Sequence, residues 1–309
     1  MTKFAVVFPG QGSQSVGMMG GFADSPVVEA TFREASAILG EDLWKLAAEG
    51  PAEALARTVV TQPLMLTAGV ACWRAWLDRG GPMPAFFAGH SLGEYSALVA
   101  AGALRFEDAL PLVRLRAQSM QEAVPEGTGG IAAIVGLADD RLEKVMQEAA
   151  QGEVLEAANL NSPGQVVIAG HRAAVERGMA AAKAHGAKIA RMLPMSAPSH
   201  CSLMRPAAER LRERLAGVAV ASPKVPVVQN ADVAAFDDPE RIRRALVEQL
   251  FRPVRWVETV RHLQAHGVAR IVECAPGKVL AGLVKRTVDG VEAVAITDSA
   301  ALAAALTNA

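Results

Sequence analysis

The chain has 309 residues, of which 51% are hydrophobic and 20% charged, and its 31 Lys and Arg against 32 Asp and Glu leave a formal net charge of -1 at pH 7. This is a globular composition, since a disordered or fibrous chain would lack so large an apolar fraction or would show a repeat. The near-zero charge argues against nucleic acid or an anionic membrane as a partner.

Three cysteines, Cys72, Cys201 and Cys274, are too few and too odd in number for a disulfide framework, and they lack the paired spacings that hold zinc. The first apolar run, residues 4–8, stops at a Pro-Gly pair before the apolar region of a signal peptide would be complete. No apolar stretch approaches the length that spans a bilayer. We therefore expect a cytoplasmic protein without a bound metal.

The first third of the chain alternates strand and helix patterns. A strand is expected over residues 4–8, a helix opens with Ser25 and Pro26, and another follows Gln62-Pro63. The loop at residues 9–14 lacks the lysine of a phosphate loop and the third glycine of a dinucleotide loop, although its backbone N–H groups could meet an oxyanion. This alternation predicts a parallel α/β sheet.

The strongest chemical signal is Gly89-His90-Ser91-Leu92-Gly93, which lies between an expected strand at 85–88 and an expected helix at 94–101. A serine on such a sharp turn is exposed, and the following helix N-terminus presents free N–H groups to a developing oxyanion. The pattern predicts a nucleophilic serine. The alternative is an ordinary glycine-rich turn whose serine only caps the helix.

The helix expected over residues 108–123 carries an arginine on its apolar side. Arg116 shares a face with Leu112, Val113 and Met120 by three- and four-residue spacing. A buried guanidinium is costly unless it meets an anion, and its planar fork matches a carboxylate. An internal salt bridge or a side chain that reaches the surface would explain the same position.

The middle of the chain shows a different order of elements. After a flexible stretch at 125–130, the pattern predicts a βαββαβ unit, which is the ferredoxin-like order, closed by Pro194. Its expected elements are a strand at 131–135, a helix at 140–150, a strand at 154–158, a turn at 161–164, a strand at 166–169, a helix at 173–185 and a strand at 188–193.

A serine nucleophile needs a base, usually histidine. His200 is the favoured candidate because it lies in an irregular segment where the chain returns from the inserted unit, although a histidine satisfied by backbone partners is the alternative. His90 is expected to point away from its neighbour Ser91, and Cys201 is interpreted as a small buried hydrophobe. The remaining histidines lie on or beside helices: His171, His185, His262 and His266.

The α/β pattern then returns, with a strand at 225–228, helices at 239–250 and 254–266, and a strand at 270–274. Both ends of the chain are therefore expected to form one α/β body. The expected boundaries are residues 1–127 and 195–309 for this large domain and 128–194 for the inserted small domain.

Taken together, the residues resemble the malonyl-CoA:acyl-carrier-protein transacylase family of type II fatty acid synthesis over nearly the whole chain. The resemblance implies an α/β-hydrolase-like large domain with a ferredoxin-like insert. It is carried by Phe8-Pro9-Gly10-Gln11-Gly12-Ser13-Gln14, Gly89-His90-Ser91-Leu92-Gly93-Glu94-Tyr95, Arg116 with Met120-Gln121, Asn159-Leu160-Asn161-Ser162-Pro163-Gly164-Gln165, Pro198-Ser199-His200-Cys201, and Gln249 before Pro253-Val254-Arg255-Trp256.

The same resemblance implies the role of each site residue. Ser91 would be the nucleophile and His200 its base, oriented by the backbone carbonyl of Gln249 in place of a carboxylate. The other implied roles are the oxyanion hole for the N–H groups of Gln11 and Leu92, the malonyl carboxylate for Arg116, and coenzyme A or pantetheine contacts for Asn159 and Asn161. The segment Ser196-Ala197-Pro198-Ser199 looks like that of stand-alone enzymes and gives no extender-unit selectivity.

The implied reaction moves a malonyl group from coenzyme A to the phosphopantetheine thiol of an acyl carrier protein through a malonyl-serine ester, with ping-pong kinetics. No bound cofactor is implied; the coenzyme A thioester is a substrate, the carrier contact is transient, and we expect a monomer. The alternatives are a serine esterase or thioesterase, a polyketide-pathway acyltransferase, and a non-catalytic carrier-protein binder. An acidic carrier would meet a basic rim, for which the candidates are Lys188, Arg191, Lys278, Lys285 and Arg286.

Overall fold

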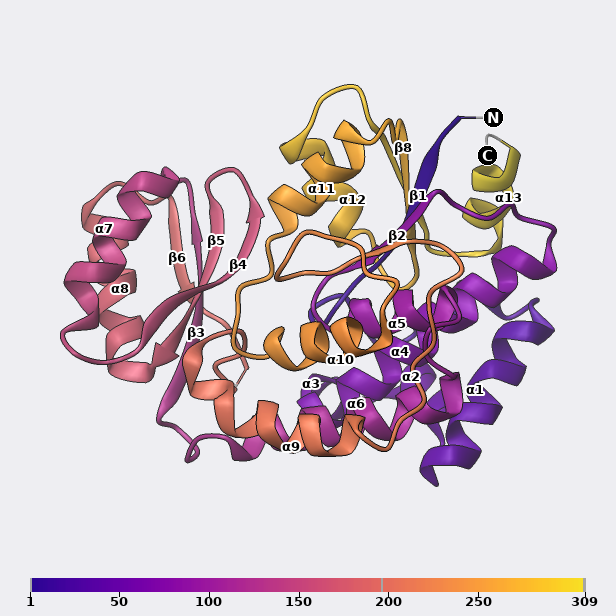
Figure 1. The fold of residues 1–309 in the computed structure, drawn as a ribbon, viewed down its shortest axis with the longest axis horizontal. Coiled ribbons are helices and arrows are strands. Elements are labelled where there is room, and N and C mark those ends of the chain that lie inside the picture. The colour runs from indigo at the N-terminus through magenta and orange to yellow at the C-terminus, as the bar shows by residue number, and fades with distance from the viewer. Residues whose placement is uncertain (1, 196, 308–309) are drawn as a thin grey trace.

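The computed structural model describes residues 2–195 and 197–307, apart from the side chain of Asp139. It contains a five-stranded parallel sheet and a separate four-stranded antiparallel sheet (Figure 1). The parallel sheet has the order β7-β2-β1-β8-β9, formed by β1 (Phe4–Phe8), β2 (Phe86–Gly89), β7 (Val227–Val228), β8 (Arg270–Cys274) and β9 (Glu292–Ile296). The expected parallel α/β sheet is confirmed.

The central strand β1 is buried along its whole length, which explains its continuous apolar run. Its alternate residues enter two cores: Phe8 packs in the cluster on one face and Val7 in the cluster on the other. Because β1 pairs in parallel with β2, Phe8 lies opposite Gly89 at the carboxyl ends of the two strands. The loop after β1 and the turn after β2 therefore leave the sheet at the same edge.

Helices cover both faces of the parallel sheet (Figure 1). The short 3-10 helices are η1 (Gly20–Phe22) and η2 (Ser202–Met204). The α-helices outside the antiparallel unit are α1 (Pro26–Leu39), α2 (Leu43–Glu49), α3 (Ala52–Ala56), α4 (Thr58–Asp78), α5 (Gly93–Ala100), α6 (Phe106–Glu122), α9 (Arg205–Leu215), α10 (Pro239–Glu248), α11 (Trp256–Ala265), α12 (Val279–Thr287) and α13 (Ser299–Thr307).

The start of α4 differs from the sequence expectation. The helix begins at Thr58, so Pro63 lies inside it and does not mark its first turn. Pro63 lies beyond the first-turn N–H groups that have no partner within a helix, so it removes one hydrogen bond from α4. The consequence is that Gln62 lies within the helix, with its side chain buried at 2% exposure.

The antiparallel sheet has the order β4-β5-β3-β6, with α7 and α8 packed against one face. Its elements are β3 (Gly129–Val135), α7 (Asp139–Ala150), β4 (Leu155–Ser162), β5 (Gln165–His171), α8 (Arg172–Ala184) and β6 (Ile189–Met192). The turn expected over 161–164 is shorter, because β4 continues through Ser162 and only Pro163 and Gly164 connect it to β5. Asn161 is therefore a strand residue.

The antiparallel unit is joined to the rest of the molecule along β4. Val254, just before α11, donates its N–H to Ala158 at 2.9 Å and accepts the N–H of Leu160 at 2.9 Å. Glu156 on the same strand accepts hydrogen bonds from the backbone and hydroxyl of Ser202. Helices α11 and α12 also contact β4 (Figure 1). These contacts hold β4 beside the carboxyl edge of the parallel sheet.

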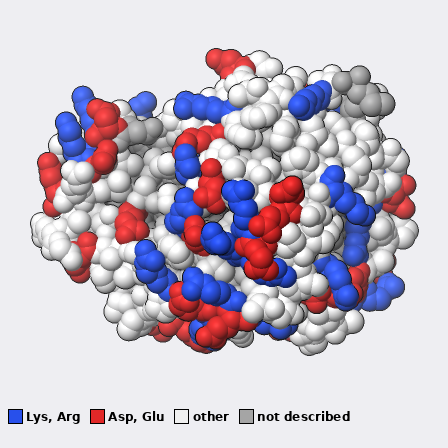
Figure 2. Space-filling view, viewed as in Figure 1, with Lys and Arg blue, Asp and Glu red and all other residues white. Residues whose placement is uncertain are grey.

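The face in Figure 2 carries positive and negative groups side by side, with no field of one sign. Oppositely charged side chains also pair directly, as Arg252 does with Asp232 at 2.7 Å. Within residues 2–195 and 197–307, none of the helices has both the length and the apolar character needed to cross a membrane.

Candidate active site

Ser91 occupies a strained turn between β2 and α5. Its φ of 52° lies in the left-handed region that few non-glycine residues adopt. The glycines on either side permit a close backbone approach: a Cβ at Gly93 would lie 2.0 Å from the carbonyl oxygen of Phe8, and one at Gly89 would lie 1.9 Å from the carbonyl carbon of Gly93. The two glycines of the motif are therefore required by packing, and the turn holds the serine at the surface of a pocket.

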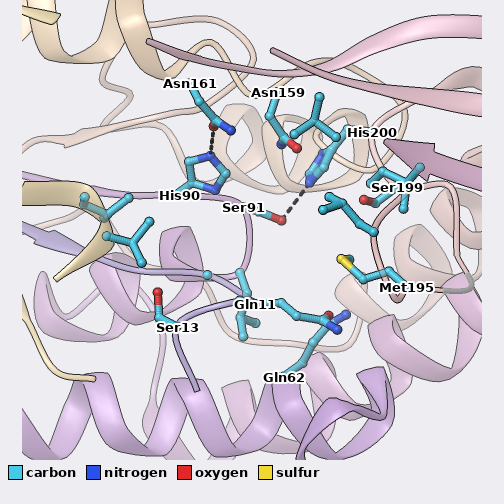
Figure 3. A pocket seen from close by; sticks show the side chains of 18 of the residues that line it. Gln11, Ser13, Gln62, His90, Ser91, Asn159, Asn161, Met195, Ser199 and His200 are labelled. Carbon is cyan, nitrogen blue, oxygen red and sulfur yellow. Dashed lines mark hydrogen bonds between the residues drawn. The ribbon is translucent and has the colours of Figure 1, made fainter. Parts of the chain in front are cut away.

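The pocket lies where the antiparallel unit meets the carboxyl edge of the parallel sheet (Figure 3). One wall comes from the large body, through the β1 loop, the Ser91 turn, α4, α6 and α12. The other wall comes from the antiparallel unit and the chain that leaves it. The lining residues are Gly10, Gln11, Gly12, Ser13, Gln62, His90, Ser91, Leu92, Arg116, Met120, Ile131, Asn159, Asn161, Gln165, Val167, Leu193, Met195, Ser199, His200, Val279, Leu280 and Leu283.

His200 lies directly against the serine. Its Nε2 is 2.7 Å from the Oγ of Ser91 (Figure 3), and its Nδ1 is 2.7 Å from the backbone oxygen of Gln249. A carbonyl oxygen can only accept, so Nδ1 carries the proton, and in the neutral ring Nε2 is left to accept the serine hydroxyl. This is the geometry of a serine with its general base.

The environment of His200 favours the neutral imidazole. Burial, followed by the positive charge of Arg116, lowers the pKa of His200 to about 3. The ring is therefore unprotonated at neutral pH and available to accept a proton. Because an imidazolium is costly here, proton transfer from Ser91 depends on negative charge that develops beside it during the reaction.

Two backbone N–H groups in the pocket can meet that negative charge. Gln11, in the loop after β1, and Leu92, at the start of α5, both line the pocket. Within the described part of the chain, neither backbone N–H donates a hydrogen bond to another residue. Free N–H groups that converge beside a reactive serine can stabilise a tetrahedral oxyanion.

Arg116 is buried at 1% exposure, on the apolar face of α6 as its spacing predicts. Its Nη1 donates to Oε1 of Gln62 at 2.7 Å, and its Nη2 donates to Oε1 of Gln249 at 2.9 Å and to the Oγ of Ser91 at 3.3 Å. These partners are all neutral. Among the described residues Arg116 forms no ion pair, and its side chain does not reach the surface. Neither an internal salt bridge nor a surface position therefore explains this arginine.

The carboxyl group of Glu94 on α5, which interacts electrostatically with Arg116, is itself fully buried. Burial raises the pKa of Glu94 to about 8, so the group is mostly protonated at pH 7. It therefore neutralises little of the charge on Arg116. A buried guanidinium with neutral partners has the charge and the geometry to pair with an anionic group.

From the sequence, Gln249 was expected to orient His200 through its backbone carbonyl. In the structure its side chain also forms hydrogen bonds within the site. Nε2 donates to the backbone oxygen of Ser91 at 2.9 Å, while Oε1 accepts from Arg116. Gln62 and Asn230, which also contact this group, were not identified from the sequence. Nothing in the local sequence pattern marks either residue as part of the site.

The ring of His90 is directed to Asn161, and among the described residues it forms no hydrogen bond with Ser91, in line with the expectation that it points away from its neighbour. Its ring lines the pocket, with Nε2 2.8 Å from Oδ1 of Asn161 (Figure 3). Strand β4 runs opposite the turn and supplies this partner for the ring, which also packs against Trp256. Asn159, two residues away on β4, lines the pocket without contacting Ser91 through any hydrogen bond between described residues.

Cys201 is a buried thiol next to the base, as expected. Its Sγ donates to the backbone oxygen of Pro198 at 3.1 Å, and burial raises the pKa of Cys201 to about 12. The group is therefore a thiol at neutral pH and a poor nucleophile. In the segment before His200, Ser196 lies outside the described residues, while Ser199 lines the pocket.

A serine on a strained turn, a neutral histidine and free N–H groups are the arrangement by which enzymes transfer acyl groups through a covalent ester. The chain belongs to the acyl transferase domain family, whose sequence model matches residues 5–306.

Within this family the similarities are specific and cover the full chain. It is 58% identical to the malonyl CoA-acyl carrier protein transacylase of Salmonella typhimurium over 309 residues, which is 100% of both chains. A crystal structure of the acyl-carrier-protein S-malonyltransferase from Burkholderia pseudomallei 1710b matches with a TM-score of 0.98 at 57% identity, covering 99% of this chain and 100% of that one. A type II polyketide synthase malonyl-transacylase, solved in complex with its acyl-carrier protein, matches with a TM-score of 0.98 at 52% identity over 100% of both chains.

Proposed function

We propose that this protein transfers a malonyl group from coenzyme A to the phosphopantetheine thiol of an acyl carrier protein through a malonyl ester of Ser91. The observation that carries the proposal is that one serine oxygen lies within hydrogen-bond distance of both a neutral histidine and a buried arginine without an anionic partner. The names of the full-length relatives support the same reaction. The pathway fed by this transfer is fatty acid synthesis.

In the first half of the proposed cycle, Ser91 attacks the thioester carbonyl of malonyl-CoA while His200 accepts the hydroxyl proton. The tetrahedral oxyanion is held by the N–H groups of Gln11 and Leu92. His200 then gives its proton to the departing coenzyme A sulfur, and a malonyl-serine ester remains. In the second half, His200 takes the proton of the carrier thiol as its sulfur attacks the ester, and gives that proton to the Oγ of Ser91 as the ester bond breaks.

Substrate choice is proposed to depend on Arg116. Its side chain is held by two amides, Gln62 and Gln249, which fix the guanidinium in the pocket without neutralising it. The free carboxylate of a malonyl group would supply the missing charge partner, while an acetyl group would leave a desolvated cation unpaired. Asn159 and Asn161, on the opposite wall, are proposed to contact the pantetheine arm that both substrates share.

The test is the mass of the intact protein after mixing with malonyl-CoA and, in parallel, with acetyl-CoA. A stable increase of one malonyl group on Ser91, formed with malonyl-CoA and lost on addition of carrier protein, is the expected result. The Ser91→Ala variant forms no adduct. Rapid release of free malonate without an adduct would support a thioesterase, and no reaction at all would support a non-catalytic carrier binder.

The proposed carrier partner approaches over a basic rim. The candidate side chains are all exposed, and none of them takes part in an ion pair among the described residues: Lys188, Arg191, Lys278, Lys285 and Arg286. Val279, next to Lys278, is 46% exposed and lines the pocket mouth. Because exposed charges are screened by salt, association with an acidic carrier should weaken as ionic strength rises, and an unchanged affinity would contradict this rim.

A carrier of a polyketide pathway is a second candidate, because one structural relative was solved with such a carrier. Comparing transfer rates to a fatty acid and a polyketide carrier protein distinguishes the two, since the chemistry at Ser91 is the same in both.

The proposal extends to the organisation of the chain. Residues 1–127 and 195–309 are proposed to form an α/β-hydrolase-like large domain, and residues 128–194 a ferredoxin-like small domain. The βαββαβ order and the β4-β5-β3-β6 sheet support the second assignment. We also propose that the protein works in the cytoplasm as a monomer without a bound cofactor, with coenzyme A entering only as part of the substrate.

A further inference from the structure

Asn230 lies behind the Ser91 turn and contacts both sides of it. Its Oδ1 accepts the backbone N–H of Ser91 at 2.7 Å, and its Nδ2 donates to the backbone oxygen of Gly89 at 2.5 Å. The side chain is fully buried. The orientation of the amide is determined by these partners, because a carbonyl can only accept and an N–H can only donate.

The position of Asn230 follows from strand pairing and from two backbone bonds. β7 pairs in parallel with β2, so the residues that follow β7 lie beside the turn that follows β2. The backbone N–H of Asn230 donates to Oε2 of Glu94 at 2.7 Å, and its carbonyl accepts the N–H of Arg255 at 3.1 Å. The amide is thus held from both sides of its own backbone.

The contacts of Asn230 meet a specific need of the serine. A left-handed φ at a residue with a side chain costs energy and persists only when the surroundings enforce it. Asn230 holds the N–H of Ser91, while Nε2 of Gln249 holds its carbonyl oxygen at 2.9 Å. With both peptide groups of the serine occupied, the N–H of the turn that has no partner among the described residues is that of Leu92.

We propose that Asn230 is a positioning residue, which holds the strained Ser91 turn so that Oγ faces His200 and the Leu92 N–H remains directed into the pocket. Asn230 itself does not line the pocket and therefore acts through the serine. The inference rests on the proposed function, because it assumes that Ser91 is the nucleophile.

The test compares Asn230→Ala and Asn230→Asp with Gln229→Ala. Gln229 is the matched control: it is the neighbouring buried amide, and neither its side-chain nitrogen nor its oxygen has a partner among the described residues. The measurements are the rate of malonyl-serine formation in a single turnover, kcat and KM for malonyl-CoA, and the rate at which a fluorophosphonate probe labels Ser91. The probe reports serine alignment independently of coenzyme A binding.

A displacement of the nucleophile by about 1 Å can cost roughly a hundredfold in rate. Asn230→Ala should therefore lower kcat about a hundredfold with KM within about threefold of wild type, and slow probe labelling by a similar factor. Asn230→Asp keeps an acceptor for the Ser91 N–H but loses the donor to Gly89, so it should fall between Asn230→Ala and wild type. Gln229→Ala should retain wild-type rates.

The inference is overturned if a folded Asn230→Ala variant acylates and labels Ser91 within threefold of Gln229→Ala. If circular dichroism shows that Asn230→Ala is unfolded at the assay temperature, Asn230→Asp carries the test, and wild-type rates in that variant overturn the inference. Failure of the proposed function gives a different result, because wild-type protein itself would then form no malonyl-serine ester.

Discussion

Replacement of Arg116 by alanine is expected to remove the preference for malonyl over acetyl donors. The guanidinium is buried and hydrogen-bonded to neutral groups, so its positive charge is not neutralised before an incoming carboxylate binds. A malonyl carboxylate in contact with it lies about 4 Å from the centre of the positive charge, where an effective dielectric of about 20 gives roughly 4 kcal/mol of attraction. Desolvation of the carboxylate offsets part of this gain.

A net difference of about 3 to 4 kcal/mol corresponds to a fall of roughly 10²- to 10³-fold in the ratio of kcat/KM for malonyl-CoA to that for acetyl-CoA. Arg114→Ala is the control. This arginine is on the same helix, but it forms an ion pair with Glu41 at 3.0 Å and does not line the pocket. The assay is acyl-enzyme formation with each donor in turn, followed by quenching and mass measurement. If Arg116→Ala keeps a ratio within threefold of both wild type and Arg114→Ala, the assigned selectivity is wrong.

Three further outcomes are expected. First, kcat/KM for malonyl-CoA should show no loss with a pKa near 6.5 between pH 7 and pH 5, because the pKa of His200 is held at about 3; a downward break near 6.5 would contradict this environment. Second, Gly93→Ala should abolish the acyl-enzyme and lower Tm, since its Cβ would meet the Phe8 carbonyl, whereas Gly20→Ala, with open space at its Cβ, should leave both unchanged. Third, the pKa of Glu94 is higher in the folded protein than in the unfolded chain, so the folded state binds more protons between about pH 4.5 and pH 8. The contribution of Glu94 to the free energy of unfolding therefore falls as pH rises through that window. The free energy of unfolding of wild type minus that of Glu94→Gln, measured by urea titration, should decline from pH 5 to pH 8. A constant difference would show that Glu94 is ionised in the folded protein.

The residues recognised from sequence are those whose local pattern already contains the physical constraint. The turn at Ser91 could be predicted because its glycines answer a steric requirement within five residues, and the burial of Arg116 followed from helical spacing alone. The parallel sheet and the separate antiparallel unit could likewise be predicted, from the order in which strand and helix patterns follow one another. In each case the signal lies within a short stretch of the sequence.

The residues that were missed act across long distances in the chain. Asn230 contacts a turn 139 residues earlier, and Gln62 contacts an arginine 54 residues later, so no local pattern marks either one. The orientation of His90 depends on Asn161, which becomes its partner only when β4 docks beside the Ser91 turn. The extension of β4 through Ser162 differs, because it depends on local pairing of Ser162 with Gln165 on β5.

The antiparallel unit supplies one wall of the pocket but neither of the two residues of the serine–histidine pair. His200 lies just beyond the unit and is anchored to the large body, through its N–H to the carbonyl of Leu250 and through its ring to Gln249. The proton-transfer machinery and the opposite wall can therefore change independently in evolution. An exchange of residues 129–192 between homologues would change the pocket wall that faces the acyl donor while leaving Ser91 and His200 in place.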